Sequence, residues 1–177
     1  MTRAKCILRD IIKTSIAACA LLLATSSLAD REVGDLGGVG KVQLENSCSK
    51  EVQSDLMRGH ALLHSMFYDE AIAVLNGVAA KDTNCAMAQW GVAMAYYHPL
   101  WAPPTPEELK NGAAALAKAK NVEKASQGEK DFIAALEVFY KDAEIVPHPE
   151  RANAFEKAMG ELASKYPNDV EAQASTR

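Results

Sequence analysis

The sequence has none of the short motifs by which many enzymes are recognised. It contains no G-x-S-x-G, no phosphate-cradling glycine loop, no C-x-x-C and no H-E-x-x-H. Acidic pairs such as Glu107-Glu108 are explained as first-turn residues, which the helix dipole favours. We therefore predict that the protein is not an enzyme, and we assign it no catalytic residue and no cofactor.

The apolar stretch near the start of the chain, Ile16 to Leu23, is too short to span a bilayer with tolerance. Four Lys and Arg residues precede it, and Ser27-Leu28-Ala29 supplies the small residues that a signal peptidase needs at its cleavage site. We predict that residues 1–29 are a signal peptide and that the mature chain begins near Asp30. The protein is then periplasmic or secreted.

A lipid anchor is the alternative to a soluble exported protein. Ile16-Ala17-Ala18-Cys19 resembles a lipoprotein cleavage box, but Lys13 lies only six residues before Cys19. No full apolar run therefore precedes that cleavage point. We favour a soluble exported protein with no membrane insertion after the signal is removed.

Basic residues and cysteines are both scarce in the mature chain. The full chain has 19 Lys and Arg residues, of which four lie in the signal, and 23 Asp and Glu residues, of which one lies there. The mature chain therefore keeps 15 basic and 22 acidic residues, a net charge of −7. This balance disfavours nucleic acid and anionic membrane surfaces as partners. Two of the four cysteines leave with the signal, and the remaining pair, Cys48 and Cys85, is predicted to form a disulfide because disulfides persist in exported proteins.

The mature chain is rich in Ala and Leu and has few β-branched runs, which predicts an all-α fold. Residues 30–47 contain four glycines and no apolar period, so we expect a flexible N-terminal segment. Apolar periodicity, capping residues and prolines predict six helices and the start of a seventh near Val170. The expected ranges are 52–67, 71–79, 85–97, 106–119, 127–140 and 150–165.

Two stretches follow the pattern of one helical repeat. Gly59-x-x-Leu62, then Tyr68-Asp69-Glu70-Ala71-x-x-x-Leu75 and Asp82, resembles the tetratricopeptide (TPR) repeat, and Trp90-Gly91 repeats its first helix 32 residues later. The chain also resembles exported bacterial TPR-containing proteins of unassigned role. The resemblance implies TPR-like helical hairpins over residues 48–177, stacked as a short right-handed solenoid. It also places Cys48 and Cys85 near the starts of two parallel helices.

By the same resemblance, one face of the first helix lines a concave groove that binds a peptide or protein partner. The implied groove residues are Gln53, Leu56, His60, Leu63 and His64. Tyr96 and Trp101, beside a proline-rich loop, are candidates for further partner contacts. The alternative is a small-ligand or metal-binding periplasmic protein that uses His60 and His64, which are four residues apart and share a helix face.

The last predicted helix carries an apolar stripe that needs a neighbour. Phe155, Ala158, Met159 and Leu162 recur at helical spacing, while the segment after Pro167 is too short to cover much surface. A terminal repeat ordinarily needs a capping helix. We therefore expect an unfinished C-terminal end that self-associates or depends on further sequence.

Overall fold

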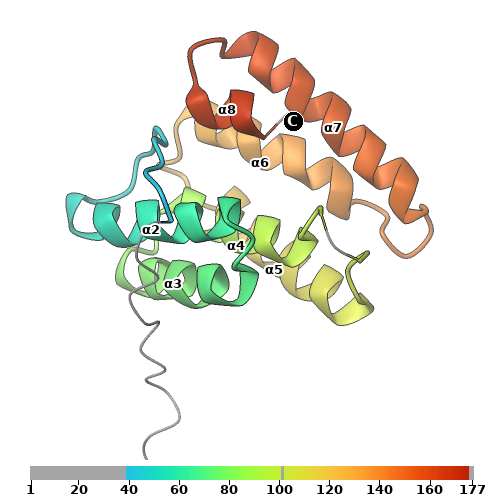
Figure 1. The fold of residues 1–177 in the computed structure, drawn as a ribbon, viewed down its shortest axis with the longest axis horizontal. Helices are drawn as coiled ribbons and strands as arrows, with labels where there is room; N and C mark the ends of the chain where they lie inside the picture. Colours follow the sequence, from blue (N-terminus) through green and yellow to red (C-terminus); the bar gives the residue numbers. More distant parts are fainter. Residues whose placement is uncertain (1–38, 101, 176–177) are drawn as a thin grey trace, which may run out of the picture. The chain divides into compact units, whose positions relative to one another are not determined.

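The structure is a computed structural model that describes residues 39–100 and 102–175. The predicted signal peptide, the first part of the segment 30–47 and Trp101 lie outside these residues. Within them the chain forms seven α-helices and no strand, so the predicted all-α class is confirmed (Figure 1). A short 3-10 turn, η1 (Lys50–Val52), precedes the α-helices. The α-helices are α2 (Gln53–His64), α3 (Tyr68–Lys81), α4 (Ala86–Tyr97), α5 (Pro106–Lys120), α6 (Gln127–Tyr140), α7 (His148–Lys165) and α8 (Val170–Ala174).

Local sequence signals set several helix ends where they were predicted. Thr105 caps α5 and Ser126 caps α6, each in a complete capping box whose glutamate, Glu108 or Glu129, bonds back to the cap residue. Helix α4 ends at Tyr97, and His98 takes a left-handed conformation, with φ of 34°, just before Pro99. These signals act over a few residues, so they can be read without knowing the fold.

Consecutive helices pack against one another along the chain, and Figure 1 shows α2 beside α3 and α6 beside α7. Gly59 on α2 and Gly91 on α4 both face the fully buried side chain of Leu75 on α3. A Cβ at either glycine would overlap the leucine, so the missing side chains allow the three helices to approach closely. Both glycines of the repeat pattern therefore lie against α3, Gly59 from the helix before it and Gly91 from the helix after it.

The last helices are fixed to the rest by buried polar groups. Trp90 on α4 is fully buried, and its indole N–H donates to the carbonyl of Phe132 on α6 at 3.1 Å. Arg151 on α7 is buried as well, and it donates to the carbonyl of Phe139, the penultimate residue of α6, at 2.8 Å. Its guanidinium also lies over the Phe139 ring, 4.5 Å from the centroid.

The end of the segment 30–47 is packed, which corrects its assignment as a flexible lead-in. Leu44 is buried, and the side chains of Asn46 and Gln53 exchange two hydrogen bonds of 3.1 and 2.7 Å. Ser47 donates through its backbone N–H and its hydroxyl to the buried carboxylate of Glu129, at 3.0 and 2.7 Å. A glycine-rich composition did not reveal these long-range partners.

The apolar stripe of α7, which was expected to lack a neighbour, is largely covered within the chain, and only Ala158 of its four residues remains half-buried. Phe155, Met159 and Leu162 are each at least nine-tenths buried, because α7 packs against α6. Helix α8 adds to the cover and buries Ala172. Helices α6 and α8 of the same chain therefore cover most of this stripe.

Cys48 and Cys85 lie at disulfide distance, as predicted. Their sulfur atoms are 2.06 Å apart and their Cα atoms 4.5 Å apart. The bridge joins the segment before η1 to the residue that caps the start of α4. Among the described residues, no helix is both long and apolar enough to cross a membrane.

Candidate functional site

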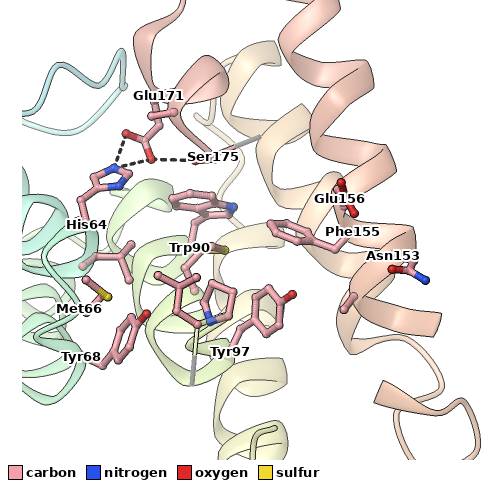
Figure 2. Close-up of a pocket in the computed structure, with 16 residues that line it drawn as sticks. His64, Met66, Tyr68, Trp90, Tyr97, Asn153, Phe155, Glu156, Glu171 and Ser175 are labelled. Carbon is pink, nitrogen blue, oxygen red and sulfur yellow. Dashed lines mark hydrogen bonds and ion pairs between the residues drawn. The ribbon is translucent and has the colours of Figure 1, made fainter. Parts of the chain in front are cut away.

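A pocket of about 390 Å³ lies where α2, α3 and α4 face α7 and α8. Four aromatic rings contribute to its wall: Tyr68 from α3, Trp90 and Tyr97 from α4, and Phe155 from α7. Figure 2 shows these rings around the pocket, with the Glu171 carboxylate beside His64 at its upper end. Leu63, Met66, Met94, Pro99, Leu100, Ala152, Asn153, Glu156, Ala174 and Ser175 complete the lining.

Helix periodicity explains why α4 supplies so much of this wall. Trp90, Met94 and Tyr97 are separated by four and three residues, so they project from one face of the helix. The Tyr97 ring meets the Phe155 ring of α7 edge to face, with centroids 5.3 Å apart. Burial raises the pKa of the Tyr97 hydroxyl, which is therefore neutral at physiological pH.

At one end of the pocket, His64 of α2 contacts Glu171 of α8. The imidazole Nε2 lies 3.0 and 2.9 Å from the two carboxylate oxygens, and the Ser175 hydroxyl donates to Oε1 at 3.3 Å. Glu171 is only 2% exposed, whereas the His64 side chain is 35% exposed. The hydrogen bond to Glu171 raises the pKa of His64. Burial alone would raise the pKa of Glu171, but the bond from His64 and its charge outweigh burial and lower it.

The charged side chains of the pocket are acidic. Glu156 and Glu171 line it, and among its described lining residues there is no Lys or Arg. The one basic group on the wall is His64, which already contacts Glu171. The pocket therefore combines aromatic surface with carboxylates, which suits a ligand that is partly apolar and carries no negative charge.

Only some of the predicted groove residues line the pocket. Leu63 and His64 line the pocket, but Leu56 and His60 are fully buried between helices and do not line an open groove. Gln53 is engaged with Asn46 instead. Helical spacing showed that these residues share a face of α2, but it did not show how much of that face other helices cover.

His60 belongs to the core. Its Nε2 lies 3.2 Å from the carbonyl oxygen of Met87, which makes this nitrogen the donor, and its ring stacks on Trp90 with centroids 5.8 Å apart. Burial lowers the pKa of His60 and keeps the ring neutral. His60 is therefore enclosed between helices, whereas His64 lies at the pocket with its Nε2 bonded to Glu171, so the two histidines do not face one open site. Within the described ranges, no group of three or more His, Cys, Asp and Glu residues is placed to hold a metal ion.

The aromatic candidates beside the proline-rich loop are not the ones that meet at the pocket. Tyr96 is half-buried and does not line it, and Trp101 lies outside the described residues. Tyr97, the residue after Tyr96, does line the pocket. So does Tyr68, a residue of the repeat pattern. Trp90, Met94 and Tyr97 were identifiable as one helix face from their spacing. Glu171 has no comparable signal, because it lies in a helix of five residues.

No protein-family model, no curated protein and no solved structure matches the chain. Fold and site together define an all-α protein with a pocket that is aromatic and acidic.

Proposed function

We propose that this chain is an exported, TPR-like binding protein whose pocket accepts part of a peptide or protein partner. The observation that carries the proposal is a space of about 390 Å³ lined by four aromatic residues from three helices, of which Tyr68 is the most exposed and Trp90 is fully buried behind the surface. Aromatic side chains are large, rigid and able to contact apolar groups, and they are enriched where proteins bind one another. No catalytic role is assigned to the residues of the pocket.

The TPR-like architecture is supported by the contacts of the repeat residues. Gly59 and Gly91, 32 residues apart, both allow a helix to approach Leu75, and Ala71 of the same pattern is fully buried. The small residues of the pattern thus lie where neighbouring helices touch. We extend this to a short right-handed solenoid whose helices α2 and α4 present one wall of the pocket.

Export is supported by the predicted signal peptide and by the cysteine pair. Cys48 and Cys85 lie at disulfide distance, and such bridges persist in the periplasm and outside the cell. A periplasmic or secreted location also agrees with the net charge of the mature chain, which disfavours nucleic acid as a partner.

The proposal is tested by filling the pocket. Ala152 lines it from α7, and Ala152→Phe would occupy the space with a further ring. Ala80→Phe is the matched control, because Ala80 is exposed on α3 and does not line the pocket. Binding to an array of short peptides of varied sequence is compared among the wild type and both variants. We expect Ala152→Phe alone to lose the peptides that the wild type retains; equal binding by all three proteins would contradict the proposal.

A small-molecule ligand is the second candidate, and the volume of the pocket favours it. Pockets for small ligands span roughly 300 to 1,000 Å³, and this pocket falls near the lower limit. A ligand that binds only the folded state raises the melting temperature. A compound library screened by thermal shift, again with Ala152→Phe and Ala80→Phe, separates this candidate from a peptide partner.

A further inference from the structure

The lining of the pocket has a pattern of charge that specifies its occupant further. Glu171 and Glu156 lie on different helices, α8 and α7, and four aromatic rings line the wall with them. Among the described lining residues, Lys and Arg are absent, so no cation of the wall neutralises Glu156. Aromatic faces attract cations through their quadrupoles, and carboxylates attract them through charge. An organic cation with an apolar stem satisfies both parts of this wall.

We propose that the pocket binds a lysine or arginine side chain of a peptide partner. This inference rests on the proposed binding function and names the group that the pocket recognises. The hydrocarbon stem of such a side chain packs against rings, while its charged end stays close to carboxylates. In Figure 2 the Glu171 carboxylate lies at one end of the pocket, and Tyr68 and Tyr97 lie toward the other. Trp90 is fully buried and Tyr97 nearly so, so the half-buried Tyr68 offers a stem the most ring surface.

The rim of the pocket favours a peptide over a free amine. Met66 is 42% exposed and Leu100 is 69% exposed, and both line the pocket. Apolar side chains exposed together at the mouth of a pocket usually mark a surface that a macromolecule covers. A free amine would fill the interior and leave these two side chains in water, whereas residues beside a bound lysine would cover them.

His64 determines when Glu171 is available to a cation. While the imidazole is neutral it donates a hydrogen bond and Glu171 keeps its negative charge; once protonated, it neutralises Glu171 and repels a cationic ligand. The other titratable groups that face the pocket are Glu156, Tyr68 and Tyr97, and His60 is buried behind its wall. Because the pKa of His64 is raised, binding is best measured near pH 9, well above the ordinary range of histidine and below that of a lysine side chain.

The test uses three peptides that differ at one central residue: lysine, norleucine or glutamate, each flanked by alanine and leucine. Norleucine keeps the four-carbon stem and lacks the charge, so the comparison isolates the ammonium group. Calorimetry on the mature chain should give binding about tenfold tighter for lysine than for norleucine, and weaker still for glutamate. An arginine peptide should bind like lysine. Butylamine, the free form of the same group, should bind more weakly than the lysine peptide.

Two substitutions connect the preference to the pocket. Glu156→Gln and Glu171→Gln should each reduce the preference for lysine over norleucine, with little effect on norleucine itself. Glu161→Gln is the control, because Glu161 is exposed on α7 and does not line the pocket. Glu156 is exposed too, so its variant keeps the test valid even if Glu171→Gln disturbs the fold.

The possible failures are distinguishable. Equal binding of lysine and norleucine peptides, lost in Ala152→Phe, would overturn the cation preference and retain the binding function. If butylamine binds as tightly as the lysine peptide, the conclusion that the cationic group belongs to a peptide is wrong. If no peptide of the series binds, this inference is wrong, and the array of varied peptides with Ala152→Phe decides the proposed binding function separately.

Discussion

His64 and Glu171 are 107 residues apart in the chain, yet the imidazole Nε2 lies 2.9 Å from the nearer carboxylate oxygen. The contact joins α2, the first α-helix of the described residues, to α8, which has only five residues. A helix of that length is unstable by itself in water, so its position depends on tertiary contacts. The pair therefore holds one end of the pocket wall in place.

We predict that a double-mutant cycle of His64→Ala and Glu171→Ala gives a favourable coupling free energy of about 1 kcal/mol, since one partner is buried and the other is partly exposed. The same cycle on Lys81 and Asp55, a pair at 2.8 Å with both side chains exposed, should give a smaller value. Urea unfolding provides the four free energies for each cycle. Hydrogen exchange should also show faster exchange in α8 after His64→Ala; unchanged protection there would contradict the role assigned to the pair.

The stability contributed by this pair should depend on pH. The pKa of His64 is raised from 6.5, so its contribution is complete below that value and is lost as pH rises through the folded-state pKa. The pKa of Glu171 is lowered from 4.5, so its contribution is complete above that value and is lost as pH falls through the folded-state pKa. The two contributions are complete together between pH 4.5 and 6.5.

The comparison that isolates this dependence is wild type against Glu171→Gln. The difference in unfolding free energy should be larger at about pH 5.5 than at about pH 9, as measured by urea denaturation. His60, whose pKa is lowered mainly by burial, makes both proteins less stable as pH falls below 6.5. The Glu171 charge partly offsets that shift, so Glu171→Gln lowers the pKa of His60 further and adds to the difference at about pH 5.5. A difference that stays constant with pH would show that the charge of Glu171 does not stabilise the protein through either histidine.

Alanine at the two repeat glycines should destabilise the fold. In Gly91→Ala the new Cβ would lie 2.7 Å from Leu75 Cδ1, and in Gly59→Ala it would overlap the same side chain. Because Leu75 is fully buried and cannot move aside freely, each change should cost about 1–3 kcal/mol. Gly77→Ala on α3 is the control: nothing lies within 4 Å of its added Cβ, and it should stabilise by about 0.5–1 kcal/mol. Similar results at all three positions would contradict close helix approach.

Removing the bridge between Cys48 and Cys85 should lower stability substantially. The two residues are 37 apart in sequence, and on the chain-entropy model closing a loop of that length stabilises by about 4 kcal/mol. Cys48→Ser with Cys85→Ser should show this loss in urea denaturation, and a reductant should affect the wild type but not the double variant. Intact mass under non-reducing conditions identifies the bridge; two free thiols in protein expressed in the periplasm would exclude it.

The sequence by itself determined the helices and the way neighbouring helices touch. The capping boxes at Thr105 and Ser126 and the stop before Pro99 depend on residues a few positions apart. The glycines at 59 and 91 were recognisable from their repeat spacing, although Leu75, which they contact, lies on another helix. Local backbone geometry and side-chain volume fix such features, so spacing alone predicts them. The pairing of Cys48 with Cys85 was also accessible, because only two cysteines follow the predicted signal.

Only the tertiary structure decided which side of each helix is covered. The period of α2 shows that Leu56, His60 and His64 lie near one face, but α3, α4 and α8 approach that face differently along its length. Leu56 and His60 are consequently buried, while His64 remains partly exposed and contacts Glu171. Burial and the pKa of a side chain depend on groups that are distant in sequence, and a helical period contains no information about them.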